Sequence, residues 1–359
     1  MIACIAKNDR GRPLFSALAA LNPRYRDLGY ATGTQSALRH GFASSVGLDI
    51  AQMKRDARFS PQFLASLSNS CSELLRAQSE KVDAVIYWGA TNLPFNRAQK
   101  SYPYYIISDG PFDPNDDSYP VEWKPKRWAT QYLATQREVF SGAVHTFTLS
   151  DWARNKIISV HGIAPEKVSK VGWGPLGCIG DAIYEVGINK KILLSVGSDW
   201  RRKGMDVVAE AGAMIAKEFP DVQTVLMGVP GDLVIKPAPG VLLMPYAVPS
   251  TVVHTMMRQS TAFIIAARFD ASPHVIYEAL QYGTPVIGTN TCGVPEAIDA
   301  PNGGWVISKT QIDLLVEAMR QAILTSSPER RLMARKVYDQ SGGWAGSAHR
   351  IHDVIGRQP

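Results

Sequence analysis

Residues 269–288 read FDASPHVIYEALQYGTPVIG, and this stretch decides the fold class. It follows Ala262–Ala266, an apolar run with the length of a buried strand. Ser272 is predicted as the N-cap of a helix and Pro273 as its first residue, positions that these residue types favour. Gly283 then ends the helix, and a second apolar run begins the next strand. A strand, a helix and a strand in this order predict a parallel unit of an α/β protein.

Two carboxylates lie eight positions apart around the predicted helix start, Asp270 on the loop and Glu278 inside the helix. The free backbone N–H groups of the first helical turn are expected at the carboxyl end of the preceding strand. This is the usual place for a phosphate in an open α/β sheet. A ligand with an anionic middle and hydroxyl groups at both ends matches this pattern, and a nucleotide-sugar is such a ligand.

Strand-like and helix-like runs alternate along most of the chain, which predicts a doubly wound α/β protein. A helix is predicted at Asp151–His161, with Ser150 as its N-cap and Gly162 after its end. In the first half the predicted strands are Ile2–Ala6, Ala84–Trp88, Tyr104–Ser108, Thr146–Leu149 and Val168–Gly172. At 359 residues the chain is too long for one ordinary core. Residues 173–190 are rich in glycine and lack a hydrophobic period, so we expect the hinge there. The sequence therefore predicts one domain over residues 1–175 and a second over residues 188–340.

Residues 172–177 read GWGPLG and match the G-x-G-x-x-G pattern after a strand. A dinucleotide fingerprint requires a helix that begins at the third glycine. Pro175 and the next predicted strand at Ile192 leave too little room for that helix. A nicotinamide cofactor site is therefore not predicted.

A basic cluster, GSDWRRKG at residues 197–204, follows the predicted strand Ile192–Val196. Arginine binds a phosphate through two N–H groups and lysine binds it as a point charge. Positive charge at the start of a helix opposes the helix dipole. Basic residues at this place are therefore typical of a site that faces an anion.

The chain resembles family 4 glycosyltransferases, which are retaining nucleotide-sugar enzymes of the GT-B fold. The resemblance rests on the acid-x7-acid pair and the run ALQYGTPV at 279–286, with Asp270 where most members have Glu. It rests also on residues 197–204, which resemble the subgroup with Gly-Ser-Asp-aromatic-x-Arg-Lys-Gly. The resemblance implies two Rossmann-like, doubly wound domains that face each other across a cleft. It also implies that a final helix, within residues 343–359, returns to the N-terminal domain.

The resemblance implies a role for each candidate site residue. Arg202 and Lys203 would grip the diphosphate, with Arg201 in solvent. Asp270 would contact the donor sugar, and Glu278 the ribose hydroxyls. Further donor-site candidates are Ser198, Ser272, Pro273 and His274.

Two candidates lie in the N-terminal half. Gly11 is the one glycine left where family members often have a Gly-Gly-x-Gly loop after the first strand. Asp109 stands where relatives carry a His or Asp that faces the sugar, and an Asx-type turn is the alternative for it.

The implied function is retaining transfer of a hexose or similar sugar from a nucleotide-diphosphate-sugar to a hydroxyl group. The acceptor is expected to be a glycan, a glycolipid or a lipid-linked saccharide. No cofactor and no metal are expected. The cationic pair and the helix dipole would stabilise the charge of the diphosphate in place of a metal, and no Asp-x-Asp motif is present. Two alternatives stay open: a catalytically silent module that binds a nucleotide-sugar, and a sugar-nucleotide epimerase.

Composition limits the partners and the compartment. The net charge of +6 suits phosphate-bearing ligands or an anionic membrane surface and is too diffuse to indicate nucleic acid. Four scattered cysteines and the absence of a signal-like start predict a cytoplasmic protein with reduced thiols. The run WKPKRW at 123–128 leaves peripheral contact with the inner face of a membrane open.

Overall fold

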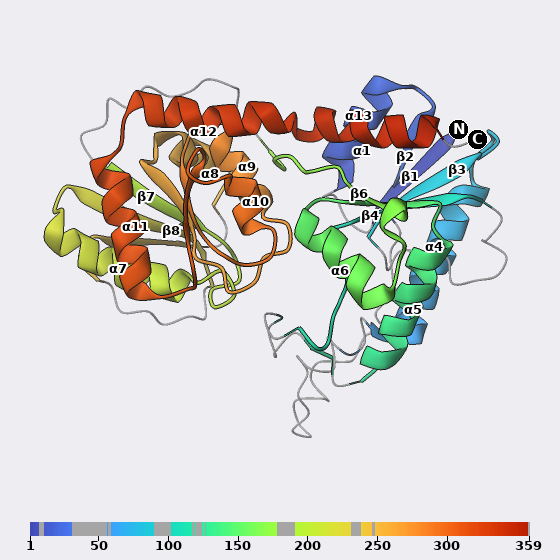
Figure 1. Cartoon of the computed structure of the whole chain (residues 1–359), viewed down its shortest axis with the longest axis horizontal. Helices are drawn as coiled ribbons and strands as arrows, with labels where there is room; N and C mark the ends of the chain where they lie inside the picture. Colours follow the sequence, from blue (N-terminus) through green and yellow to red (C-terminus); the bar gives the residue numbers. More distant parts are fainter. Residues whose placement is uncertain are drawn as a thin grey trace. The chain divides into compact units, whose positions relative to one another are not determined.

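A computed structural model of the chain describes residues 1–6, 11–30, 56, 59–89, 102–116, 119, 124–125, 127–177, 191–230, 238–245 and 248–357. The chain divides into two compact units, Met1–Gly172 with Trp344–Pro359, and Trp173–Gly343. Each unit contains a six-stranded sheet flanked by helices (Figure 1). Both sheets are parallel, so the predicted doubly wound α/β class is confirmed.

The sheet of the first unit has the strand order β2-β1-β3-β4-β5-β6. Its strands are β1 (Ile2–Ala6), β2 (Tyr25–Tyr30), β3 (Ala84–Trp88), β4 (Tyr104–Ser108), β5 (His145–Thr148) and β6 (Val168–Lys170). Its helices are α1 (Arg12–Leu21), α4 (Pro61–Arg76), α5 (Ala129–Gly142), α6 (Asp151–His161) and α13 (Gly343–Gly356). The strand order reverses between β1 and β3, the point at which ligands bind in folds of this kind.

The core of the first unit forms where amphipathic helices cover a wholly apolar sheet centre. All five residues of β1 and of β3 are buried. Helix α4 begins with Ser60 as its cap and Pro61 in its first turn, and it turns Phe63, Leu67 and Cys71 toward that sheet. Their spacing of four residues places them on one helix face.

The sheet of the second unit has the strand order β12-β11-β10-β7-β8-β9. Its strands are β7 (Lys191–Val196), β8 (Val222–Val229), β9 (Val241–Pro245), β10 (Ala262–Ile265), β11 (Val286–Thr289) and β12 (Gly304–Ile307). Its helices are α7 (Met205–Glu218), α8 (Ser250–Gln259), α9 (His274–Leu280), α10 (Val294–Ile298), α11 (Ile312–Leu324) and α12 (Pro328–Ser341).

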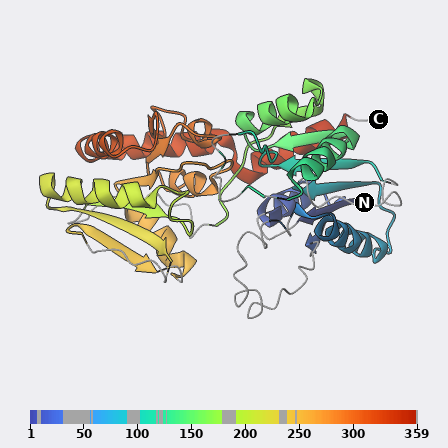
Figure 2. The ribbon, with the colours of Figure 1, turned by 90° about the horizontal axis from the view of Figure 1, so that it is seen from below.

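The connections of the second unit place its helices on both faces of the sheet. The connection through α7 runs from β7 to β8, whereas those through α8, α9 and α10 run across the sheet in the opposite direction. Because such crossovers are right-handed, the two groups lie on opposite faces. Helices α7 and α11 share the core with β7, β8 and β10, and Figure 2 gives a second view of these layers.

Among the described residues, no helix is both long enough and apolar enough to span a bilayer.

Candidate functional site

The turn that carries the basic cluster lies close to the ends of two central strands because glycines make room for it. Gly204 has a φ of 69°, and a Cβ atom there would lie 1.9 Å from the carbonyl oxygen of Ala266. A Cβ atom at Gly197 would lie 2.9 Å from Cγ of Lys203. The Lys203 side chain therefore crosses the end of β7, directly over the glycine.

The structure brings together Arg202, Lys203 and Asp270, three of the predicted site residues of the second unit. The Nζ atom of Lys203 forms a short ion pair with Oδ2 of Asp270. The Nη1 atom of Arg202 lies 3.8 Å from the same oxygen and donates to the Phe269 carbonyl oxygen at 3.1 Å. Asp199 accepts from Nε of Arg202 at 3.1 Å. In this structure both cations thus contact carboxylates of the protein itself.

Asp270 lies between the two cations with only 7% of its surface exposed. Burial raises its pKa, but the charge and hydrogen bond of Lys203, followed by the charges of Arg202 and His274, outweigh that effect. The net result is a pKa below the ordinary value for an aspartate. A phosphate that approaches Lys203 must therefore compete with an ionised carboxylate.

Arg268 holds the turn of residues 197–204 in place. It is not among the residues that the sequence motifs indicate. Its Nη1 and Nη2 atoms each lie 2.8 Å from an oxygen of Asp206, a bidentate pair, and its backbone N–H donates to the Arg202 carbonyl oxygen at 2.8 Å. The only signal in the sequence was its place two residues before Asp270. Nothing in a single sequence pairs it with a residue 62 positions away.

The predicted start of helix α9 is wrong by one residue. The helix begins at His274, and Pro273 occupies the cap position with a ψ of 79°, outside the helical range. A tight turn causes this shift, since the backbone N–H of His274 donates to the carbonyl oxygen of Ser272 at 2.9 Å. Ser272 therefore does not cap the helix, and its buried hydroxyl has no partner among the described residues. The N–H of His274 is not free for a phosphate in this conformation.

Glu278 lies inside α9 with its carboxylate held by a backbone group. Its Oε1 atom accepts a hydrogen bond from the N–H of Leu176 at 3.1 Å. Burial raises the pKa of Glu278, while this hydrogen bond and the charge of Lys203 act in the opposite direction. Glu278, the residue expected to bind the ribose, is therefore already oriented by Leu176, which lies within the predicted hinge.

The remaining candidates are Ser198 in the second unit and Gly11 and Asp109 in the first. Ser198 is exposed on the same turn. Gly11 is buried before α1, where a Cβ atom would lie 3.2 Å from side-chain atoms of Ala6 and Trp88. Asp109 is exposed after β4, and the turn there is closed by Ser108, whose Oγ accepts from the Gly110 N–H at 3.2 Å. Gly11 and Asp109 belong to the first unit, and their roles stay predictions.

Two sequence predictions fall on residues outside the described ranges. They concern most of the hinge, from residue 178 to 190, and Trp123 and Lys126 of the predicted membrane-contact run. Within the described ranges, no group of three or more His, Cys, Asp or Glu side chains is arranged to hold a metal ion.

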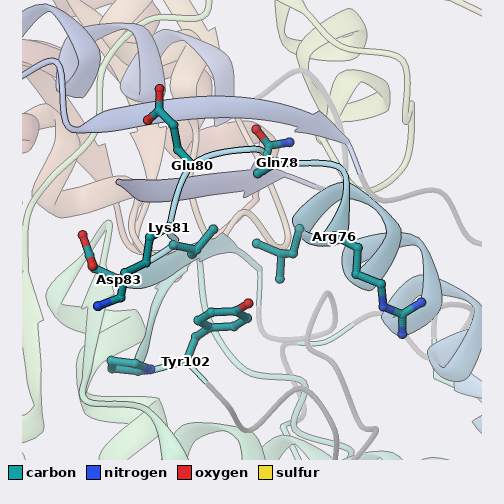
Figure 3. A pocket seen from close by; sticks show the side chains of 9 residues that line it. Arg76, Gln78, Glu80, Lys81, Asp83 and Tyr102 are labelled. Carbon is teal, nitrogen blue, oxygen red and sulfur yellow. The ribbon is translucent and has the colours of Figure 1, made fainter.

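A separate hollow of about 510 Å³ lies in the first unit, at the amino ends of β3 and β4 (Figure 3). Arg76, Glu80, Lys81, Asp83 and Tyr102 are among the residues that line it. Ligands of parallel sheets bind at the carboxyl ends of the strands, which is the opposite edge. The hollow contains none of the predicted site residues, and we assign it no role.

Comparison with known proteins identifies the class of the second unit. The family described as "Glycosyl transferases group 1" matches residues 182–340. Granule-bound starch synthase 1 of Zea mays is 22% identical over 235 residues. That match covers 60% of this chain but only 39% of the starch synthase. Residues 182–340 are therefore similar to a glycosyltransferase group 1 domain.

Solved structures show the same fold over the whole chain. A sucrose-phosphate synthase from Thermosynechococcus elongatus matches with a TM-score of 0.76 at 12% identity, covering 99% of this chain and 98% of the other. HepE of Anabaena in complex with UDP matches with a TM-score of 0.66 at 12% identity, covering 99% and 100%. Together with the two parallel sheets, these matches show a GT-B fold.

Proposed function

We propose that the protein is a retaining hexosyltransferase that moves a sugar from a nucleotide-diphosphate-sugar to a hydroxyl group. The observation that carries the proposal is the cluster of Arg202, Lys203 and Asp270 at the strand ends of a glycosyltransferase group 1 domain. Two cations beside a carboxylate suit a diphosphate whose sugar has hydroxyl groups. The fold neighbour solved with UDP supports a nucleoside diphosphate as the leaving group.

In the proposed reaction, Lys203 exchanges its contact with Asp270 for the diphosphate of the donor. Arg202 and Lys203 then stabilise the negative charge that develops as the bond between sugar and diphosphate breaks. The oxygen of the acceptor hydroxyl forms a bond to the anomeric carbon on the face from which the diphosphate leaves, and its proton passes to the leaving diphosphate. The anomeric configuration is therefore retained. Each cation supplies charge stabilisation of about 3 kcal/mol, typical of a preorganised site. The reaction proposed here uses neither a metal nor a side-chain nucleophile.

The acceptor is proposed to be a glycan, a glycolipid or a lipid-linked saccharide, with the enzyme in the cytoplasm or at the inner face of a membrane. The diffuse positive charge of the chain suits phosphate-bearing or membrane-bound acceptors.

Incubation of the purified protein with a panel of nucleotide-diphosphate-sugars tests the proposed function. The expected result is release of free nucleoside diphosphate, with Lys203→Met as the inactive control. Binding of donor without release, even with acceptors supplied, would identify a silent module. Conversion of the donor into an epimer, followed by NMR, would identify an epimerase and reject the transferase.

The two acids are expected to respond differently to neutralisation. Glu278→Gln should weaken binding of the bare nucleoside diphosphate by about tenfold, since the ribose contact exists without the sugar. Asp270→Asn should not weaken that binding, because it removes the carboxylate that competes for Lys203, but it should reduce sugar transfer. Calorimetric titration with nucleoside diphosphate and an assay of transfer measure the two effects. The opposite order of affinities would reject these roles.

A further inference from the structure

Helix α9 holds an extended segment along one of its faces. We call residues Trp173–Gly177 the strap. Two side chains of α9 and that of Gln281, the residue after its end, contact the strap at spacings of four and three residues, which lie on one helix face. Nδ1 of His274 is 3.0 Å from the Gly174 carbonyl oxygen, Oε1 of Glu278 accepts from the Leu176 N–H at 3.1 Å, and Nε2 of Gln281 donates to the Gly177 carbonyl oxygen at 2.9 Å.

The strap is packed as well as hydrogen-bonded. Trp173 is 2% exposed, and its ring meets that of Tyr277 edge to face with centroids 5.3 Å apart. The strap therefore follows α9 from its first residue to the residue after its end. It also begins directly after Gly172, the last residue of the first unit before the chain enters the second.

Gln281, which contacts the last residue of the strap, is buried. Its side chain is 1% exposed, and Nε2 also donates to the Glu278 carbonyl oxygen at 3.2 Å. Its own carbonyl oxygen accepts from Nη1 of Arg335 at 2.7 Å. An apolar side chain of the same length would fill the space without the cost of burying an amide. The hydrogen bond to the strap therefore explains why a polar amide is buried at this position.

We infer that Gln281 is a positioning residue for nucleotide binding, which holds the strap so that the Leu176 N–H fixes the Glu278 carboxylate in one orientation. This inference rests on the proposed function, in which Glu278 binds the ribose hydroxyls. With Oε1 engaged by Leu176, the carboxylate presents Oε2 in a fixed direction. A preoriented acceptor loses less rotational freedom when the nucleotide binds. Gln281 itself contacts no ligand.

Gln281→Met tests the inference, because it removes the donating amide and keeps the length of the side chain. Gln321→Met is the matched control, since Gln321 is an exposed helical glutamine of the same unit whose amide donates to Glu317 at 2.9 Å. The probes are UDP, GDP and inorganic pyrophosphate, titrated by calorimetry. We expect Gln281→Met to weaken the nucleotide by about tenfold, the equivalent of one hydrogen bond, and to leave pyrophosphate unchanged. The control should change neither.

Coupling to Glu278 separates positioning from general damage. In a Glu278→Gln background, Gln281→Met should add little further loss, because both changes act on the same contact. Hydrogen exchange at the Leu176 amide should become faster in Gln281→Met and stay slow in Gln321→Met. Gln281→Leu repeats the test if the methionine variant folds poorly.

The outcomes are distinguishable. Equal losses of nucleotide and pyrophosphate affinity, or additive losses with Glu278→Gln, would overturn the positioning role. Wild-type affinity for nucleotide in a folded Gln281→Met protein would overturn it as well. A wild-type protein that binds neither nucleoside diphosphates nor pyrophosphate would instead reject the proposed function, and the positioning role with it.

Discussion

Lys203→Met is expected to lower the turnover of sugar transfer by about 100-fold or more, as for loss of one charged group that stabilises a leaving anion. The lysine faces the diphosphate in the proposed reaction, and its ammonium group forms an ion pair with Asp270. Turnover at saturating donor, measured by release of nucleoside diphosphate, gives the effect. Turnover within a few-fold of wild type would remove Lys203 from the site.

The same substitution is expected to destabilise the fold, because the buried carboxylate of Asp270 loses its ion pair with Lys203. The Nη1 atom of Arg202 lies 3.8 Å from that carboxylate. Removal of one partner of a buried pair typically costs about 3 kcal/mol or more. The double variant Lys203→Met with Asp270→Asn is the control for this cost. It should recover stability without recovering turnover, which separates the chemical role of the lysine from its structural one.

The pH dependence of stability gives a related expectation. Because the folded-state pKa of Asp270 is lowered, its contribution to stability is present above the pKa of the unfolded chain and is lost as pH falls through the folded value. In Lys203→Met this contribution should shrink, so the variant should lose less additional stability in acid than the wild type. Urea unfolding over the acid range measures both slopes.

Arg331→Met is expected to lower the free energy of unfolding by about 3–5 kcal/mol, because it leaves buried carbonyl oxygens without a donor, each at a cost of about 1–3 kcal/mol. Arg331 is 5% exposed, and burial lowers its pKa to about 10. It donates to the carbonyl oxygens of Ser260 and Arg258, each at 2.8 Å, and to that of Tyr282 at 2.9 Å. It thus joins the ends of α8 and α9 to the start of β10.

Denaturant unfolding with Lys336→Met as a control tests this expectation, since Lys336 is exposed on the same helix. The control should change stability by less than about 0.5 kcal/mol. A loss of less than about 1 kcal/mol in Arg331→Met would show that the three carbonyl groups find other donors.

Elements with strong local signals could be predicted closely from the sequence. The range of α6 was predicted correctly because the side chain of Ser150 caps it and Gly162 ends it with a φ of 68°. Central strands β1, β3 and β4 were predicted with the correct bounds because they are continuous apolar runs. The missed strands β2, β9 and β12 lie at sheet edges, where exposure weakens the apolar pattern. Helix α12 was missed because charged residues dominate its sequence.

In the site as well, short motifs could be recognised in the sequence, whereas contacts between residues far apart in the chain could not. The residue types of the basic turn and of the acid pair were visible locally, and they indicated an anionic ligand. The pairing of Lys203 with Asp270 spans 67 positions, and that of Leu176 with Glu278 spans 102. Both depend on tertiary contacts that one sequence does not encode in a readable form. In the sequence the strap has the pattern of the expected hinge and of a failed dinucleotide motif, because its partners in and after α9 lie about 100 positions further along the chain.

The preference of the site for a nucleoside diphosphate over a nucleoside monophosphate is the most direct test of whether Lys203 binds the diphosphate of the donor. Wild type and Lys203→Met are titrated by calorimetry with UDP, UMP, GDP and GMP. We expect at least one nucleoside diphosphate to bind the wild-type protein about tenfold or more tightly than the monophosphate of the same base. We expect Lys203→Met to remove most of this preference. Equal affinity of the wild type for the diphosphate and monophosphate of each base, or a preference that survives loss of Lys203, would contradict this expectation.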